Sequence, residues 1–272
     1  MRVGFIGLGS QGAPMARRIV EAGFPTTLWA RRSATLAPFA RAGATTAGSP
    51  VELAAASDVV CLCVVDDADV EQLAYGPDGV LAGLRPGGVL VVHSTVHPDT
   101  CRRLEDEARI HRVSVLDAPV SGGGRAAEDG SLLVMAGGDA QVFAHCRPMF
   151  SAYGNPVVHL GATGAGQTAK LLNNVVFAAQ LALAADTFAL GTSLGLDREE
   201  LGRVLPKGSA GSFAVERVAA AGGTLDRIAK HAGGLLAKDV RLFAEIADSA
   251  GVAATGPVRE GARAALRVMG LG

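Results

Sequence analysis

One glycine-rich string near the N-terminus constrains the fold more than any other feature of the chain. Gly7-Leu8-Gly9-Ser10-Gln11-Gly12 follows the apolar run Arg2–Ile6, a predicted strand, and opens the helical pattern Ala13–Ala22. In such a unit the first glycine permits a tight turn, the second lets a pyrophosphate approach the backbone, and the third lets helix and strand pack closely. The helix N-terminus adds free N–H groups and a positive dipole end. We therefore predict a dinucleotide-binding turn; a glycine-rich turn without a ligand is the alternative.

Strand and helix patterns alternate through the first 160 residues or so, which predicts a parallel, doubly wound sheet. The continuous apolar run Asp58–Val65 is typical of a strand that helices cover on both faces. Ser33 can cap a helix over Ala34–Ala42, and Ser49-Pro50-Val51-Glu52 has the pattern of a capping box. The remaining predicted strands are Thr26–Ala30, Gly88–His93, Val113–Leu116, Leu132–Ala136 and Val157–Leu160.

The pattern changes near Gly161, and we find no convincing strand beyond it. Ala165–Thr192 predicts one long helix, and Asp197-Arg198-Glu199-Glu200 is a second capping box. Further helices are predicted over Ser212–Ala221, Leu235–Ser249 and Val258–Met269. We therefore predict an α/β Rossmann-type NAD(P)-binding domain over residues 1–162 and an all-α domain over residues 163–272.

Composition and charge exclude several classes of function. The chain is 49% hydrophobic and 19% charged, so it can bury a substantial core. Its 25 basic and 26 acidic residues give a net charge of −1, which predicts no nucleic-acid or membrane partner. The four cysteines and six histidines show no metal-ligand spacing, so no metal site is expected. Gln180 and Asp186 interrupt the apolar stretch Val175–Leu190, which favours a buried helix. With no signal-peptide pattern at the N-terminus, we expect a cytoplasmic protein.

The residues after the second predicted strand bear on the choice of cofactor. A carboxylate at this place would accept a hydrogen bond from the ribose 2′-hydroxyl of NAD. The chain has Ala30-Arg31-Arg32-Ser33 instead. Two guanidinium groups suit a 2′-phosphate, so we predict that NADP is preferred and that NAD is the alternative. Either arginine could instead be a solvated surface charge.

Four separated motifs, which together span nearly the whole chain, resemble those of the β-hydroxyacid dehydrogenases. This family includes 3-hydroxyisobutyrate dehydrogenases and glyoxylate/succinic semialdehyde reductases. The motifs are Gly4–Gly9 continuing to Gly12-Ala13-Pro14-Met15-Ala16, then Asp117-Ala118-Pro119-Val120-Ser121-Gly122-Gly123, then Gly164-Ala165-Gly166 with Lys170, Asn173 and Asn174, and finally Lys238-Asp239. The resemblance implies an oxidoreductase that moves a hydride between nicotinamide and a small hydroxy acid.

The resemblance also implies roles for individual residues. Lys170 matches the catalytic lysine, and Asn174 shares its helix face because the two are four residues apart. A lysine at a domain junction can protonate a carbonyl oxygen, and burial beside a positively charged nicotinamide would lower its pKa from about 10.4. The loop Ser121, Gly122 and Gly123 offers neutral donors to a substrate carboxylate. A solvated lysine and an ordinary glycine turn are the structural alternatives.

The remaining assignments rest on the family match. Val65 and Thr95 end strands where the cofactor would lie, and Lys238 matches a cofactor contact. Asp239 is expected to support the substrate site. His231 stands where related reductases often carry an aromatic residue, and we place it near the substrate; most of the other histidines are expected to be ordinary polar or core residues.

These features predict an NADP-preferring enzyme that interconverts a small 3-hydroxy acid, or a related hydroxy acid, and its semialdehyde or carbonyl form. An imine reductase or reductive aminase is the first alternative, although such enzymes commonly replace the lysine. A non-catalytic dehydrogenase-like assembly module is the second. The apolar helical half predicts a homodimer or a higher homo-oligomer.

Overall fold

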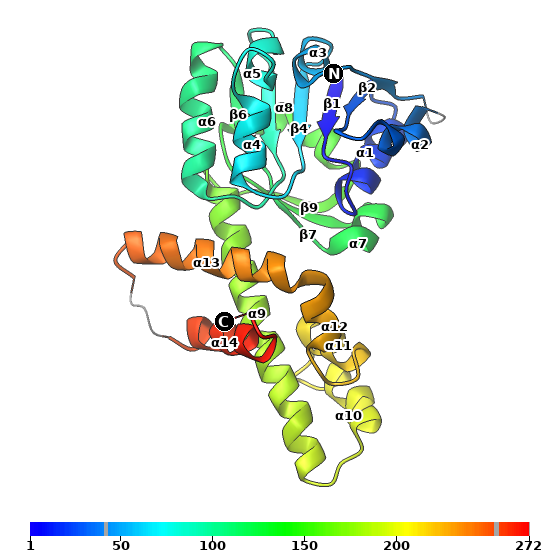
Figure 1. The fold of residues 1–272 in the computed structure, drawn as a ribbon, viewed down its shortest axis with the longest axis vertical. Helices are drawn as coiled ribbons and strands as arrows, with labels where there is room; N and C mark the ends of the chain where they lie inside the picture. The colour runs from blue at the N-terminus through cyan, green and yellow to red at the C-terminus, as the bar shows by residue number, and fades with distance from the viewer. Residues whose placement is uncertain (41–42, 253–255, 272) are drawn as a thin grey trace. The chain divides into compact units, whose positions relative to one another are not determined.

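The computed structural model describes residues 1–40, 43–252 and 256–271. The chain forms two compact units, Met1–Lys170 and Leu171–Gly272, which are described separately below (Figure 1). The first unit is built on β-sheets covered by helices, and the second is helical.

A six-stranded sheet, in which every neighbouring pair is parallel, forms the centre of the first unit. Its strand order is β3-β2-β1-β4-β5-β6, the order of a doubly wound dinucleotide-binding sheet. The strands are β1 Val3–Ile6, β2 Thr26–Trp29, β3 Thr45–Thr46, β4 Val59–Leu62, β5 Val89–Val92 and β6 Ser114–Asp117. The predicted α/β class is confirmed, although the two-residue strand β3 carries no pattern that would have predicted it.

Both faces of this sheet are buried, which explains why its strands are continuously apolar. Successive side chains of a strand point to opposite faces. Val59 and Cys61 therefore join the core under the helices α1 Gly12–Glu21 and α8 Ala140–Phe150. Val60 and Leu62 join the core on the other face. The helices over that face are α3 Pro50–Ala55, α4 Asp67–Ala74, α5 Val80–Gly83 and α6 Pro98–Ile110 (Figure 1).

The later strands of this unit form a second sheet instead of extending the first. It comprises β7 Val120–Ser121, β8 Leu132–Ala136 and β9 Gly154–His159. Strand β7 pairs antiparallel with β8, so the expectation of a single parallel sheet does not extend to this part of the chain. Backbone hydrogen bonds between Asp117 and Gly137 join the two sheets. The short helix α7 Gly123–Asp129 separates β7 from β8.

Helix starts in the first unit follow the predicted capping residues in one of two cases. Ser49 Oγ accepts a hydrogen bond from the Glu52 N–H at the start of α3, as its capping box predicts. Ser33 instead begins a 3-10 turn, Ser33–Leu36, which leads into α2 Ala37–Ala40. Residues 41 and 42, the end of the predicted helix Ala34–Ala42, lie outside the described residues.

The second unit is organised around α9 Ala165–Ser193, whose length agrees with the helix predicted from the sequence. The shorter elements are α10 Arg198–Val204, a 3-10 turn Leu205–Lys207, α11 Phe213–Ala220, α12 Asp226–Ile228, a π-helical turn Ala229–Gly233, α13 Gly234–Ser249 and α14 Pro257–Val268. Asp197 and Ser212 cap α10 and α11, as the sequence predicts for the capping box at Asp197.

Helix α9 is long and apolar enough to cross a membrane by length and composition alone, a test that the core helix of a soluble protein also passes. One of its faces carries the fully buried residues Val175, Ala178, Leu181 and Phe188. These pack with residues of α11, α13 and α14 in a single core. One face of α9 therefore forms part of the core of this unit.

The division between the units falls at Lys170, whereas the sequence predicts a boundary between residues 162 and 163. Side chains of the first unit account for the difference. Asp117 accepts hydrogen bonds from the N–H groups of Gly164 and Gln167, and the Gln167 side chain bonds to the backbone after β5. The first turn of α9 consequently belongs to the first unit.

Candidate functional site

The glycine-rich turn between β1 and α1 has room for no side chain at its first and third glycines. Gly7 has φ of +101°, and a Cβ there would lie 2.1 Å from the Cys63 carbonyl oxygen. A Cβ on Gly12 would lie 1.9 Å from the Gly7 carbonyl oxygen. These contacts explain why the turn requires glycine at both places, as the sequence predicts for a tight turn with close helix–strand packing.

The second glycine differs, because a Cβ on Gly9 would meet no atom within 4 Å. The exposed backbone of Gly9 and Ser10 therefore borders open space at the start of α1. Beside it, the buried Nε2 of Gln11 has no hydrogen-bond partner among the described residues. An open backbone at a helix N-terminus, together with a donor that lacks an acceptor, fits the pyrophosphate of a dinucleotide. Gly7, Leu8, Gly9, Ser10, Gln11 and Gly12 could hold that group.

The two arginines after β2 are exposed, and Arg31 is engaged within the protein. Its guanidinium forms an ion pair with Asp69 on α4, and Nη2 lies 3.4 Å from Gln72 Oε1. The other carboxylate oxygen of Asp69 accepts from the Val65 N–H at 3.4 Å. The predicted cofactor residues Arg31 and Val65 thus share Asp69, a neighbour that no sequence motif indicated. Arg32 is exposed immediately before the 3-10 turn.

A second predicted loop lies against the glycine-rich turn. Ser121 ends β7, and Gly122 and Gly123 have φ of +131° and +76°, a region that favours glycine. A Cβ on the next residue, Gly124, would lie 3.1 Å from the Ser10 carbonyl oxygen. The structure therefore brings the predicted substrate loop and the predicted phosphate loop together, although they are more than a hundred residues apart in the sequence.

The carboxyl ends of β5 and β6 hold a buried polar cluster. It includes Gln167 and Asp117, to which no role was assigned from the sequence. The Gln167 side chain donates from Nε2 to the Ser94 carbonyl at 2.8 Å and accepts at Oε1 from the Val96 N–H at 3.1 Å. These bonds fall on either side of Thr95, which is partly buried. Ser94 Oγ in turn accepts from the Val64 N–H at 2.8 Å. One amide therefore holds the segment where the nicotinamide was predicted to lie.

Asp117, the last residue of β6, holds the start of α9. Its two carboxylate oxygens each accept one hydrogen bond at 2.7 Å, from the N–H groups of Gly164 and Gln167. Burial raises the pKa of Asp117 above its ordinary range, and these backbone hydrogen bonds oppose that shift. A buried carboxylate at the end of an apolar strand was the available signal for this residue.

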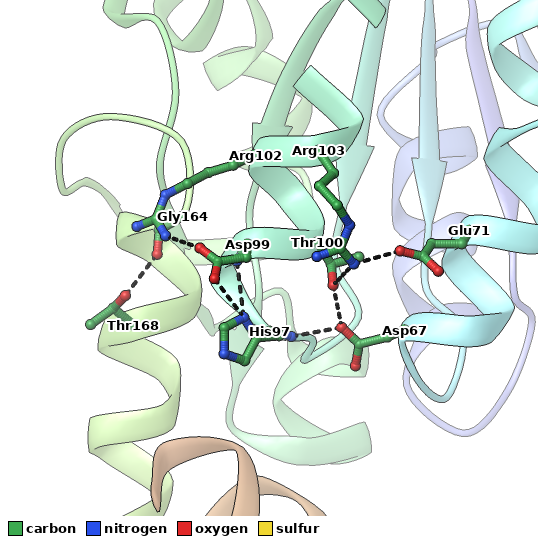
Figure 2. Close-up of polar contacts among 9 residues, drawn as sticks. All are labelled: Asp67, Glu71, His97, Asp99, Thr100, Arg102, Arg103, Gly164 and Thr168. Carbon is green, nitrogen blue, oxygen red and sulfur yellow. Dashed lines mark hydrogen bonds and ion pairs between the residues drawn. The ribbon is translucent and has the colours of Figure 1, made fainter. Parts of the chain in front are cut away.

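The loop after β5 is also fastened to α4 and α6 (Figure 2). Asp67 Oδ1 accepts from the His97 N–H at 2.8 Å and from the Thr100 hydroxyl at 2.6 Å. Arg103 donates to Thr100 at 3.0 Å and to Glu71 at 2.6 Å. The segment that begins at Ser94 is therefore held by Gln167 at one end and by Asp67 at the other.

Lys170 lies on α9 three residues beyond Gln167, and its side chain is half-buried. Asn174, one turn further along the helix, belongs to a polar chain in the second unit. Asn174 Nδ2 donates to Asp239 Oδ2 at 2.5 Å, and its Oδ1 accepts from Asn173 at 3.0 Å. Asp239 is only 5% exposed, and its other oxygen lies 3.3 Å from Lys238 Nζ. The structure therefore joins the predicted residues Asn174, Lys238 and Asp239.

His231 lies in the π-helical turn Ala229–Gly233 immediately before α13. Its side chain is exposed, and Nδ1 lies 2.7 Å from the Arg227 carbonyl. Since a carbonyl only accepts, Nδ1 carries the hydrogen of this bond. Single π-turns inside helices frequently occur at functional sites.

His93 is a core histidine, as expected for most histidines of the chain. Its Nδ1–H donates to the Ala118 carbonyl at 2.7 Å, and its Nε2 accepts from the Tyr153 hydroxyl at 3.1 Å. Burial lowers its pKa from 6.5 to about 4. As the pH falls below about 6.5, His93 therefore becomes protonated in the unfolded chain. In the folded protein it stays neutral until about pH 4.

We expect this histidine to make folding weaker in mild acid. Its contribution to the free energy of unfolding is complete above the pKa of the unfolded state and is lost as the pH falls toward the pKa of the folded state. The expected loss is about 1 kcal/mol between about pH 7.5 and about pH 5.5. Urea unfolding of the wild type and of His93→Leu at both pH values measures it. The variant should lose less stability over this interval; an equal loss in both proteins would contradict the assignment.

Comparisons with known proteins are consistent with this geometry. Residues 2–161 match the family described as the NAD binding domain of 6-phosphogluconate dehydrogenase. Residues 164–270 match the family described as NAD-binding of NADP-dependent 3-hydroxyisobutyrate dehydrogenase.

Individual relatives cover most of the chain. It is 34% identical to the NAD-dependent L-serine dehydrogenase of Pseudomonas aeruginosa, over 91% of this chain and 86% of that protein. It superposes on Mycobacterium tuberculosis 3-hydroxyisobutyrate dehydrogenase with L-serine at a TM-score of 0.83, with 29% identity, 98% of this chain and 93% of the other. An imine reductase from Pseudomonas sp. shares the fold at a TM-score of 0.68 and 18% identity, over 100% and 95% of the two chains.

Proposed function

Because the chain belongs to the β-hydroxyacid dehydrogenase family of nicotinamide-dependent oxidoreductases, we propose that it interconverts a small 3-hydroxy acid, or a related hydroxy acid, and its semialdehyde or carbonyl form, with NADP(H) preferred over NAD(H). The observation that carries this proposal is Lys170, placed just beyond a helix start that Asp117 and Gln167 fasten to the carboxyl ends of β6 and β5. Substrates of the family's named members, such as L-serine, are small hydroxy acids.

Lys170 serves as the general acid and base in this proposal. A bound nicotinamide coenzyme supplies or accepts the hydride. In the reducing direction the Lys170 ammonium donates a proton to the carbonyl oxygen, on which negative charge develops, and it stabilises that charge. In the oxidising direction the neutral amine accepts the proton of the substrate hydroxyl.

Substrate binding is assigned to neutral donors and to one exposed histidine. Ser121 and the backbone of Gly122 and Gly123 bind the substrate carboxylate. An amide nitrogen carries two hydrogens, so Asn174 can donate one to Asp239 and keep the other for a substrate oxygen. Asp239 holds that amide in place. His231 is placed near the substrate, where its Nε2 can make a polar contact in place of the aromatic residue that related reductases often carry.

Cofactor contacts are assigned to the glycine-rich turn and to five side chains. The turn Gly7–Gly12 holds the pyrophosphate. The other proposed contacts are Arg31, Arg32, Val65, Thr95 and Lys238. No group of three or more potential metal ligands occurs within the described ranges, and the proposed reaction uses none.

We expect NADPH to bind about ten- to a hundredfold more tightly than NADH, because a charge-assisted hydrogen bond to the 2′-phosphate contributes roughly 1.5–3 kcal/mol. Arg31 must exchange its ion pair with Asp69 for that phosphate. Arg31→Asp should therefore remove the preference, whereas the same charge change at Arg109, in the last turn of α6, should leave it intact. Fluorescence titration with both coenzymes measures this; equal affinities in the wild type would end the NADP assignment.

The proposed reaction is tested by coenzyme oxidation with a panel of small semialdehydes, keto acids and cyclic imines. Turnover of a semialdehyde or keto acid supports the hydroxy-acid assignment. Turnover of imines alone would favour an imine reductase, which shares the fold. Coenzyme binding without any turnover would favour a non-catalytic assembly module. We place the enzyme in the cytoplasm.

We also expect a homodimer or a higher homo-oligomer. Helix α9 exposes Val176, Leu183 and Leu190 at intervals of seven residues, which places them along one face of the helix. Leu183 is 66% exposed, and a stripe of this kind marks an association surface. Sedimentation at micromolar concentration should give a multiple of the monomer mass, and Leu183→Glu with Leu190→Glu should reduce it. A wild-type protein of monomer mass would contradict the prediction.

A further inference from the structure

We infer that Gln167 is a positioning residue that sets the register between Lys170 and the segment around Thr95. The inference rests on the proposed function, since it concerns how the proton donor and the coenzyme-binding strand end are kept in place. It gives a specific task to a residue that neither touches the reacting atoms nor belongs to the predicted site.

Gln167 makes three hydrogen bonds, two through its side-chain amide and one through its backbone N–H. The side chain is fully buried. Its amide donates to the Ser94 carbonyl and accepts from the Val96 N–H, so the two bonds bracket Thr95. Its own N–H donates to Asp117 at the end of β6. One residue of α9 is therefore fixed to the carboxyl ends of two adjacent strands.

The fastening reaches a third strand end through Ser94. Its hydroxyl accepts from the Val64 N–H, two residues after β4 ends at Leu62. Val65, a proposed cofactor contact, is the next residue. A displacement of Ser94 would therefore also displace the backbone at the two proposed cofactor contacts, Val65 and Thr95.

Helix geometry carries the constraint from Gln167 to Lys170. Residues three apart are neighbours on a helix surface, separated by roughly 4.5 Å along the axis. Because Gln167 fixes both the rotation and the translation of this turn, it also fixes where the Lys170 side chain leaves the helix. A displacement of about 1 Å at a reacting group can cost on the order of a hundredfold in rate.

Thr168, the next residue, offers a matched contrast. Its hydroxyl donates to the Gly164 carbonyl at 2.9 Å, a local bond to the residue just before α9 (Figure 2). Removing that bond perturbs the same turn without releasing the Ser94–Val96 segment. Thr168→Val is therefore the control for a general loss of helix stability.

The test compares Gln167→Leu with Thr168→Val in the full-length protein. Hydrogen exchange without coenzyme should show the Val96 amide opening on the order of tenfold faster in Gln167→Leu alone, because its acceptor is gone. With a substrate from the panel, kcat should fall about ten- to a hundredfold in Gln167→Leu. NADPH affinity should fall by less than about tenfold, because the glycine-rich turn is untouched, and Thr168→Val should stay near the wild type in all three measurements.

A second variant restores the bonds in a pH-dependent way. In Gln167→Glu, the protonated carboxyl group offers one donor and one acceptor, enough for the two hydrogen bonds that the Gln167 side chain makes to Ser94 and Val96. Burial near Asp117 raises the pKa of the introduced carboxyl, which keeps it protonated at moderate pH. Turnover relative to the wild type should therefore fall as the pH rises through that pKa. Gln167→Leu, which cannot titrate, should show a constant ratio to the wild type.

The outcomes separate this inference from the proposed function. If the wild type turned over nothing in the panel, the proposed function would fail, and Val96 exchange alone would decide whether Gln167 holds the segment. Unchanged Val96 exchange in Gln167→Leu would overturn the inference even in an active enzyme. Equal kcat values for Gln167→Leu and Thr168→Val would overturn it as well, since Gln167 would then be no more than a core residue.

Discussion

Lys170→Ala is expected to lower kcat by at least about a hundredfold while leaving NADPH affinity nearly intact. A positioned general acid contributes roughly 10²–10⁴-fold to such a reaction, and the alanine removes both the proton and the positive charge that stabilises the oxygen. The predicted phosphate-binding turn lies between β1 and α1, far earlier in the sequence, and should be untouched. The measurements are kcat with a substrate from the panel and NADPH affinity by fluorescence.

Lys170→Arg provides the matched control for charge. It keeps a cation at the same place, yet a guanidinium does not give up its proton near neutral pH, so the variant should also be inactive. Recovery of turnover in Lys170→Arg would assign an electrostatic role only. Near-normal turnover in Lys170→Ala would remove the lysine mechanism and favour the imine-reductase alternative.

Gly9→Ala is expected to weaken coenzyme binding by about ten- to a hundredfold without destabilising the protein. The added methyl group meets no protein atom within 4 Å, so the fold can accept it. It occupies the space through which a pyrophosphate would reach the backbone N–H groups of the turn. Losing charge-assisted hydrogen bonds of roughly 1.5–3 kcal/mol gives this range. Coenzyme titration and thermal unfolding are the two measurements.

Two other glycines separate coenzyme binding from stability. Gly12→Ala should destabilise the protein, because its methyl group would collide with the Gly7 carbonyl. Gly202→Ala, in α10, places its methyl group in ordinary contact with Ala219 and Phe188 and should change neither property. Normal coenzyme affinity in Gly9→Ala would mean that the open turn is not the pyrophosphate site.

The capping patterns illustrate how far local sequence reasoning extends. Ser49 and Asp197 cap their helices as predicted, because such a cap joins residues only three positions apart. The continuous apolar strands could also be predicted from the sequence, since a strand buried on both faces shows no alternation of polar and apolar residues. Strand β7 was not readable, because its two residues, Val120 and Ser121, pair with β8 across a loop and show no periodicity of their own.

The sequence indicated the parts of the proposed site, and the structure shows which of these residues lie next to one another. The sequence indicated the loops Gly7–Gly12 and Ser121–Gly123, yet their neighbourhood depends on Gly124 lying against Ser10. It indicated Asn174 and Asp239 separately, and the 2.5 Å hydrogen bond between them is a product of the packing of α9 and α13. Arg31 was predicted as a phosphate ligand, while its ion pair with Asp69 became visible only in the structure.

The sequence by itself determined the class of fold, the glycine-rich turn after β1, the long helix and the lysine on it, because each depends on residues close together in the chain. Tertiary structure alone decided what holds that lysine's helix in place. Asp117 is 50 residues from Gln167, and Ser94 is 73 residues from it. No local pattern encodes such contacts. A buried polar side chain needs hydrogen-bond partners, and the packing of the strand ends decides which backbone groups lie within its reach.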